Sequence, residues 1–236
     1  MTSFREDYNN EEWPENFINN WRQPDIENFA NLFQLHRFIK SLTKSGKYLE
    51  IGSGPSPIGI FSASIKFDDI TLSDFSDVNI DCLKKWKTVD DLDNIRTLVQ
   101  YVSALEGRDI NEMNENALKS VKKISQSDLL NHQIIPNDDS KYDVISMNFV
   151  LLSACKTEED LMKSLKNVYN KLNPGGVLYD YGAVKQQNYQ VGEKTFAHYC
   201  IDSDKLVNIV EEVGFKVSSY GKFVMSVPTY FFIASC

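Results

Sequence analysis

Two kinds of hydrophobic pattern alternate along the chain, and together they predict a parallel β-sheet covered by helices. Short, nearly continuous apolar runs are typical of strands buried on both faces, whereas apolar residues that recur every three or four positions indicate amphipathic helices. The runs predict strands near residues 48–52, 69–73, 124–128, 142–148 and 177–181. Helical spacing predicts helices at residues 58–66, from residue 75 onward, twice within 88–123, after Thr157, and at 203–213.

The end of the chain has a different pattern, because two apolar runs follow each other with almost nothing between them. Residues 215–224 and 229–234 are separated by only four residues, which is too short for a crossover helix, so this pair must be antiparallel. The pattern therefore predicts an α/β fold with one doubly wound, Rossmann-like, seven-stranded sheet, mostly parallel with a C-terminal antiparallel hairpin. We interpret residues 1–236 as a single domain.

The first part of the chain, residues 1–45, lies outside the alternation of strands and helices and is interpreted as an N-terminal helical cap. Trp13, Phe17 and Trp21 are spaced at four residues, as in a helix that packs its aromatic side chains on the body or closes over a ligand as a lid. A second helix is expected after Pro24, with Ile26, Phe29 and Phe33 among the residues of its sheet-facing side.

Composition narrows the class of protein. The chain has 236 residues, 42% of them hydrophobic and 25% charged, which are values of a globular protein. A net charge of −8 argues against binding to nucleic acid, whose phosphates attract Lys and Arg. No apolar run is long enough to span a membrane, no signal-peptide pattern opens the chain, and the four cysteines are scattered. We therefore expect a cytoplasmic monomer without a metal, acting on a small molecule.

A glycine-rich turn follows the first predicted strand, in the stretch Tyr48-Leu49-Glu50-Ile51-Gly52-Ser53-Gly54-Pro55. Its bare backbone can approach a nucleotide, and Asp74, at the end of the second strand, stands where open α/β sheets hold ribose hydroxyls. A dinucleotide fingerprint requires a third glycine where this chain has Pro57, which disfavours NAD and a nicotinamide-dependent oxidoreductase. S-adenosylmethionine, a ribose ligand without pyrophosphate, fits better; an ordinary turn that binds nothing is the alternative.

The chain resembles the family of nicotinamide, phenylethanolamine and indolethylamine N-methyltransferases and the thioether S-methyltransferase, from about residue 15 to the end. Four motifs carry the resemblance: Ile51-Gly52-Ser53-Gly54-Pro55, Asp74-Phe75-Ser76-Asp77-Val78-Asn79, Leu172-Asn173-Pro174-Gly175-Gly176, and Gly182-Ala183-Val184-Lys185-Gln186-Gln187-Asn188-Tyr189-Gln190-Val191-Gly192-Glu193. The last of these is the most restrictive, since general methyltransferases share the first and third.

The resemblance implies a set of cofactor-binding residues. These residues are Gly52, Ser53 and Gly54 for the methionine part, Asp74 and Asn79 for the ribose, Asp128 and Leu129 for the adenine, and Asn148 at the end of the fourth strand. The chemistry agrees, because a carboxylate can accept hydrogen bonds from both ribose hydroxyls or from an adenine amino group.

The same resemblance places Tyr189 and His198 at the acceptor pocket, where packing is the alternative role. At the position of a substrate-binding Asp in nicotinamide N-methyltransferase this chain has Gly182, and Asp180 is on the same side of the strand by period-two geometry. An aliphatic amine must lose a proton before methylation. His198 is the first candidate for accepting it, followed by Asp180 and Glu193.

The family's N-terminal tyrosine pair is replaced here by Phe17 and by Trp21 or Arg22. We expect an S-adenosylmethionine-dependent methyltransferase that acts on the nitrogen of a small amine or heteroaromatic acceptor and releases S-adenosylhomocysteine. Methylation of a thioether, and a non-catalytic protein that binds S-adenosylmethionine as a partner or sensor, are the alternatives.

Overall fold

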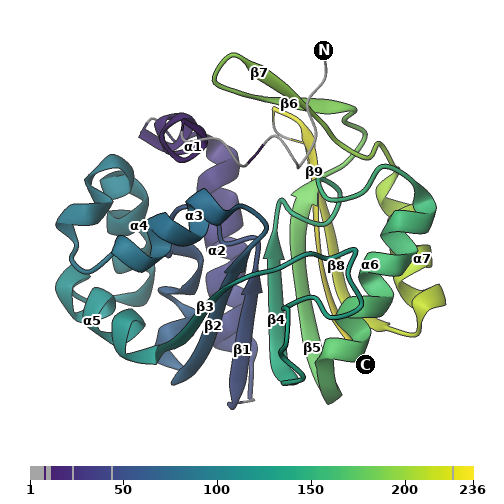
Figure 1. The fold of residues 1–236 in the computed structure, drawn as a ribbon, viewed down its shortest axis with the longest axis horizontal. Coiled ribbons are helices and arrows are strands. Elements are labelled where there is room, and N and C mark those ends of the chain that lie inside the picture. The colour runs from purple at the N-terminus through teal and green to yellow at the C-terminus, as the bar shows by residue number, and fades with distance from the viewer. Residues whose placement is uncertain (1–7, 9–11, 23, 44, 225) are drawn as a thin grey trace.

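A mixed sheet of seven strands forms the centre of the computed structural model, which describes residues 8, 12–22, 24–43, 45–224 and 226–236 (Figure 1). The strand order is β3-β2-β1-β4-β5-β9-β8; neighbours from β3 to β5 are parallel, and β9 pairs antiparallel with both β5 and β8. The strands are β1 (Lys47–Ile51), β2 (Asp69–Asp74), β3 (Val121–Gln126), β4 (Tyr142–Asn148), β5 (Leu172–Ala183), β8 (Lys216–Val224) and β9 (Pro228–Ser235). The predicted fold class is confirmed.

Seven α-helices in the described part of the chain cover the sheet and its upper edge. They are α1 (Trp13–Arg22), α2 (Ile26–Ser41), α3 (Asp77–Lys85), α4 (Arg96–Glu106), α5 (Ile110–Ser120), α6 (Glu158–Lys171) and α7 (Ser203–Val213). Two hydrophobic clusters form the core: side chains of α2 to α5 pack on one face of the sheet and those of α6 and α7 on the other. None of the described helices has the length and apolar character needed to cross a bilayer.

The helix predicted at residues 58–66 is wrong. Two 3₁₀ turns, η2 (Ile58–Ile60) and η3 (Ala63–Ile65), occupy this segment. It is short, and its β-branched isoleucines and its glycine have low helix propensity. Gly59 is required here for a steric reason, since a Cβ atom at this position would lie 1.9 Å from Oε1 of Glu50.

The side of α2 predicted to face the sheet is wrong for Ile26 and Phe33, whereas Phe29 does pack against the core. Ile26 and Phe33 are 66% and 39% exposed, whereas the buried face consists of Leu32, Leu35, Phe38 and Ile39. At 3.6 residues per turn, positions 26 and 33 lie on the side of the helix opposite to Leu35. Phe33 is instead covered by the guanidinium of Arg37, 5.9 Å from its ring centre.

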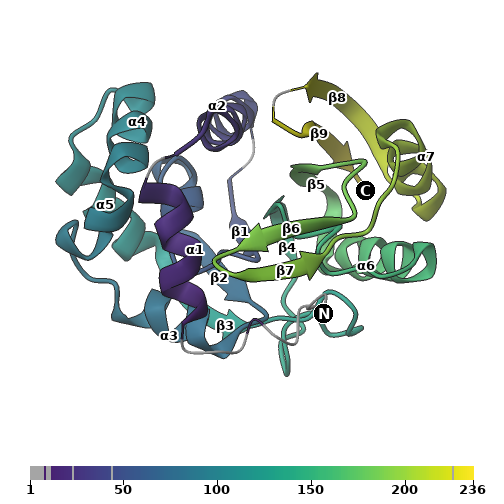
Figure 2. The ribbon, with the colours of Figure 1, turned by 90° about the horizontal axis from the view of Figure 1, so that it is seen from above.

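A small separate sheet was not predicted. Strands β6 (Asn188–Val191) and β7 (Lys194–Ala197) form an antiparallel hairpin whose turn contains Gly192 at φ +59°. Figure 2 shows this hairpin crossing above the upper edge of the main sheet, beside α1. Trp13, Val191 and Phe196 form a hydrophobic cluster between the two elements. The hairpin and α1 together therefore roof the carboxyl ends of the parallel strands.

The start of α6 carries the capping box expected from its sequence. The Thr157 side chain accepts a hydrogen bond from the Asp160 amide, and the Asp160 side chain accepts one from the Thr157 amide. We predict that Thr157→Ala lowers the free energy of unfolding by about 1 kcal/mol, because the helix loses its N-cap. Urea denaturation measures this value. Thr157→Ser, which keeps the hydroxyl, serves as the control, and an unchanged midpoint for Thr157→Ala would contradict the prediction.

Candidate active site

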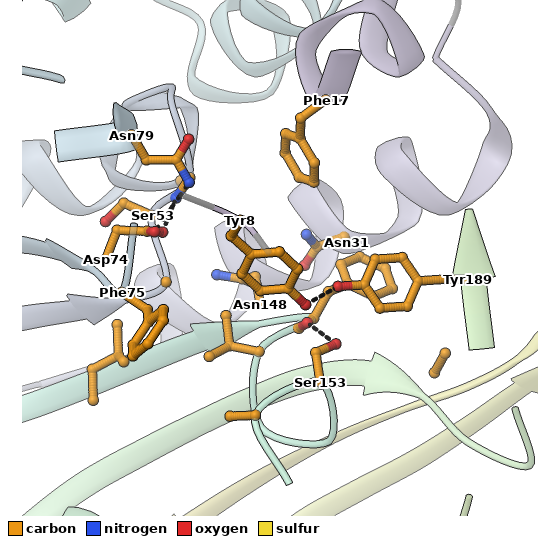
Figure 3. Close-up of a pocket in the computed structure, with 18 of the residues that line it drawn as sticks. Tyr8, Phe17, Asn31, Ser53, Asp74, Phe75, Asn79, Asn148, Ser153 and Tyr189 are labelled. Carbon is orange, nitrogen blue, oxygen red and sulfur yellow. Dashed lines mark hydrogen bonds between the residues drawn. The ribbon is translucent and has the colours of Figure 1, made fainter. Parts of the chain in front are cut away.

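A cavity of about 370 Å³ lies at the carboxyl ends of β1, β2 and β4, below α1 and the β6–β7 hairpin (Figure 3). The strand ends contribute Glu50, Asp74 and Asn148, and the roof contributes Trp13, Phe17 and Tyr189. Because adjacent parallel strands end at the same edge, the three polar residues come together although the sequence separates them widely. The cavity therefore has a polar floor and an aromatic roof.

Two glycines shape the turn after β1. Gly52 and Gly54 have φ angles of +74° and +64°, which are in the left-handed region that favours glycine. The amides of Gly52 and Ser53 both donate to the carbonyl oxygen of Ser73, at 2.8 and 3.0 Å. A Cβ atom on Gly52 would also lie 2.0 Å from Cγ2 of Val150. The first glycine is therefore fixed both by backbone conformation and by close packing.

Asp74 holds this turn from the neighbouring strand. Its Oδ2 accepts a hydrogen bond from the Gly54 amide at 2.8 Å, while Oδ1 accepts from the Ser76 amide at 2.9 Å and from Nδ2 of Asn79 at 3.0 Å. Burial raises the pKa of Asp74, and these hydrogen bonds oppose the rise by stabilising the carboxylate. Figure 3 shows Asp74 and Asn79 side by side at one end of the cavity.

Other polar groups at this end are ready to bind a ligand. The side-chain oxygens of Asn79 and Asn148 are buried and have no hydrogen-bond partner among the described residues. An unpartnered buried acceptor is costly, so a ligand carrying hydroxyl or amino groups would be favoured here. These two acceptor oxygens fit an adenosine, which offers both hydroxyl and amino groups, without requiring a phosphate.

The two residues expected at the adenine lie differently. Leu129 lines the cavity, as does its neighbour Ser127. Asp128 is not among the lining residues; its Oδ1 accepts a hydrogen bond from the Leu130 amide, and its own amide donates to Ile134. The loop after β3 thus presents an apolar side chain to the cavity and uses the Asp128 carboxylate to shape itself.

Glu50 is a cavity residue that the sequence analysis did not select. It lies in β1 directly before the glycine turn, and burial raises the pKa of its carboxyl group to about 7. Its position inside an apolar strand could have drawn attention, since a buried acid without a cationic partner usually has a role in a site.

Tyr189 and Tyr8 meet at the other end of the cavity. Their hydroxyl groups form a hydrogen bond, the Tyr189 ring stacks on Phe196 at 5.6 Å, and the Tyr8 ring stacks on Trp13 at 4.5 Å. Burial raises the pKa of Tyr189 to about 12, so its hydroxyl remains protonated near neutral pH. Tyr8 was not predicted, because nothing in its local sequence shows that it reaches this hairpin.

His198 lines the same end and has its ring edge toward Tyr189, at 6.2 Å between ring centres. Burial lowers the pKa of His198 below its ordinary value, so the imidazole is neutral near pH 7. Nδ1 lies 3.3 Å from the carbonyl oxygen of Gln186, which can only accept, so Nδ1 carries the proton. The lone pair of this neutral imidazole is then on Nε2, which can accept a proton.

The structure does not bring Asp180 and Glu193 into the cavity. Asp180 is fully buried and accepts a hydrogen bond from the Tyr230 hydroxyl at 2.5 Å, and burial raises its pKa to about 7. It does share a side of β5 with Gly182, but that side faces Tyr230 and the core under α6 and α7. Glu193 is exposed at the tip of the hairpin. Neither residue is retained as a proton acceptor.

The expected lid residues lie in α1. Phe17 lines the cavity near Gly54, since a Cβ atom on that glycine would lie 3.5 Å from the Phe17 ring. Trp21 and Arg22 end the same helix, and their side chains lie outside the described residues. The structure thus tests the aromatic lid only at Trp13 and Phe17, and both of these side chains line the cavity.

The fold is that of the class I S-adenosylmethionine-dependent methyltransferases, and solved structures of low sequence identity share it. They include the N-methyltransferase NodS from Bradyrhizobium japonicum, in complex with S-adenosyl-L-homocysteine, with a TM-score of 0.55 and 12% identity over 94% of this chain and 97% of that one. The glycopeptide N-methyltransferase MtfA has a TM-score of 0.56 at 12% identity, covering 86% of this chain and 85% of that one. At this identity the likeness concerns the fold alone.

The particular family follows from the sequence comparisons. The chain belongs to the NNMT/PNMT/TEMT family, whose model matches residues 1–235. It is 28% identical to the nicotinamide N-methyltransferase of Homo sapiens over 79% of this chain and 72% of that protein. It is also 28% identical to the indolethylamine N-methyltransferase of Oryctolagus cuniculus (79% and 73%), and 26% identical to the phenylethanolamine N-methyltransferase of Macaca mulatta (77% and 67%). The family predicted from the motifs is confirmed.

The raised pKa of Glu50 predicts how the stability of the protein depends on pH. A glutamate has a pKa of about 4.3 in an unfolded chain, against about 7 in this fold, so the native state binds more protons between these values and loses stability as pH rises through them. We predict that Glu50→Gln gains stability relative to the wild type between pH 5 and pH 7.5, measured by urea denaturation. Asp180 titrates equally in both proteins, and parallel pH profiles would contradict the prediction.

Proposed function

We propose that this protein transfers the methyl group of S-adenosylmethionine to a nitrogen atom of a small amine or heteroaromatic acceptor. One observation carries the proposal: the glycine turn with Asp74 and the pair Tyr189 and His198 line the same cavity, in which Asp74 and Tyr189 lie on opposite sides (Figure 3). A cofactor at the first end and an acceptor at the second would then face each other. Family membership supports the reaction class.

For the cofactor end we propose the following roles. Asp74 and Asn79 bind the ribose hydroxyls. Leu129 packs on the adenine, and the loop that contains Asp128 lies along the edge of the adenine ring. Asn148 completes the polar floor. Gly52, Ser53 and Gly54 leave their backbone open for the methionine part. When bound, S-adenosylmethionine supplies a methyl group on a positively charged sulfur, which is already an activated leaving group. The Asp74 carboxylate makes this end electrostatically favourable for such a cation, and Glu50 adds to the attraction as it ionises above about pH 7.

The chain's own contribution to the rate is mainly alignment and the exclusion of water. Tyr8, Trp13 and Phe17 cover the cavity with aromatic surface, which supports a closed site in which the acceptor is held in one orientation. Orientation of two reactants can contribute roughly 7–11 kcal/mol to a reaction barrier. A general base is needed only when the acceptor arrives as an ammonium ion, and neutral His198 is suited to accept its proton.

We further propose that residues 1–236 act as one domain, and that the protein is a cytoplasmic monomer that needs no metal and binds neither membrane nor nucleic acid. The described residues contain no group of three or more His, Cys, Asp or Glu side chains placed to hold a metal ion. The net charge of −8 is unfavourable for phosphate-rich partners. Gel filtration would test the monomeric state, and activity in the presence of a chelator would test whether a metal is needed.

Transfer of a labelled methyl group from S-adenosylmethionine to a panel of amines, pyridines and thioethers tests the function. We expect nitrogen acceptors to be labelled. Labelling of thioethers alone would replace the nitrogen assignment, and binding of S-adenosylmethionine without any transfer would indicate a non-catalytic partner protein. Tight binding of NAD in place of S-adenosylmethionine would contradict the proposed class altogether.

The ribose assignment predicts the effect of changing Asp74. Hydrogen bonds to a charged acceptor contribute roughly 1.5–3 kcal/mol, so we expect Asp74→Ala to weaken S-adenosylmethionine binding about 10- to 100-fold in calorimetry. Asp74→Asn keeps one acceptor oxygen for the Gly54 amide, and we expect a smaller loss for it. Circular dichroism checks that both variants fold. Wild-type affinity in the folded Asp74→Ala variant would contradict the assignment.

A separate prediction concerns His198. We expect His198→Ala to lower kcat for an aliphatic amine more than for a pyridine, because only the amine has to lose a proton before it can be methylated. The difference should shrink at high pH, where the free amine is abundant. Equal losses for both acceptors at every pH would show that the imidazole acts through shape and not through proton transfer.

A further inference from the structure

The charge of the cavity is strongly one-sided. Among its described lining side chains are the carboxyl groups of Glu27, Glu50 and Asp74, and no Lys or Arg side chain is among them. Glu50 and Asp74 belong to the cofactor end, where Asp74 already accepts three hydrogen bonds. Glu27 is hydrogen-bonded to Val227, directly before β9, and β5 and β9 are separated from β2 by β1 and β4. Its carboxylate therefore lies on the acceptor side of the cavity, where its field favours a cation and disfavours an anion.

Glu27 is held at this place by the turn between β8 and β9. It lies in the first turn of α2, and its Oε1 accepts hydrogen bonds from the Val227 amide at 2.9 Å and from the Ser226 hydroxyl. The next residue, Pro228, accepts from the Val184 amide at 2.8 Å, which brings this turn against the end of β5. Figure 2 shows the start of α2 beside the β8–β9 turn. The carboxylate is thus fixed near the carboxyl end of β5, on the face of the sheet that α2 covers.

A second acceptor lies one helical turn away. Asn31 follows Glu27 at i+4, so both side chains project from the same face of α2, and both line the cavity. Oδ1 of Asn31 is buried without a hydrogen-bond partner among the described residues. The hydrogen bonds of Glu27 named above both involve Oε1, which leaves Oε2 for a ligand. Oε2 of Glu27 and Oδ1 of Asn31 are therefore two acceptors on one face of α2 that can receive hydrogen bonds from a ligand.

We propose that Glu27 and Asn31 bind the ammonium group of the acceptor, and that the acceptors of this enzyme are amines that are cationic in solution. An ammonium group carries several N–H donors and a positive charge, so it satisfies both oxygens at once. Carboxylate-bearing acceptors are excluded by the same charge. This inference rests on the proposed methyltransferase function and assigns its substrate class and a specificity-determining residue to it.

The test compares a cation with its neutral counterpart. Calorimetric titrations of 2-phenylethylamine and 2-phenylethanol are carried out on the protein saturated with S-adenosylhomocysteine. We expect the wild type to bind the amine more tightly than the alcohol, and Glu27→Gln to weaken amine binding about 10-fold or more while alcohol binding changes less than about 3-fold. Gln keeps an acceptor oxygen for the Val227 amide, so the position of the β8–β9 turn is preserved.

Two further variants separate recognition of the ammonium group from effects that weaken the binding of any ligand. Glu159→Gln removes an exposed charge on α6 that is not among the residues lining the cavity, and should leave both affinities unchanged. Asn31→Leu removes the second oxygen at similar volume and should weaken only the amine, which keeps the proposal testable if Glu27→Gln does not fold. An amine bound no better than the alcohol by the wild type, or equal losses for both ligands in these cavity variants, would overturn the inference. Failure of the wild type to bind S-adenosylhomocysteine would instead contradict the proposed function.

Discussion

The hydrogen bonds of Asp74 are the interaction on which the arrangement of the site depends. One carboxylate connects the glycine turn after β1, the end of β2 and the first turns of α3, through Gly54, Ser76 and Asn79. These three segments are separated in the sequence, but the pairing of parallel strands already brings their ends close together. What the carboxylate adds is a fixed spacing between the open backbone of the turn and the side chain of Asn79. A ligand that meets both finds them in place before it arrives.

The rest of the cavity is assembled from elements that do not belong to this pattern of strand and helix. α1, the start of α2 and the β6–β7 hairpin form its walls and roof, and they come from opposite ends of the sequence. The Tyr8 backbone carbonyl accepts a hydrogen bond from Ser76, while its hydroxyl reaches Tyr189, so one residue connects the two halves of the site. The sheet and its helices thus supply the floor of the cavity, and these additional elements supply its walls and roof.

The sequence predicted the floor far better than the roof. Strand β4 and helix α7 lie at the residues expected for them, because their apolar patterns are clear, and Gly52, Asp74 and Asn148 follow from the ends of such strands. Period-two geometry correctly grouped Asp180 with Gly182, but it does not tell which side of β5 faces the cavity. Tyr8 and Glu27 escaped because their place depends on tertiary contacts with Tyr189 and Val227, which no local pattern encodes. The buried face of α2 was predicted wrongly for the same reason.

The pair of 3₁₀ turns after the glycine turn has an electrostatic consequence. In a dinucleotide-binding fold a long α-helix begins at this point, and its aligned peptide dipoles place about half a positive charge against the pyrophosphate. Here the segments Ile58–Ile60 and Ala63–Ile65 are too short to build up such a macrodipole. The pocket thereby lacks the attraction that would retain a diphosphate, and a ligand whose charge is positive near this turn meets no opposing field.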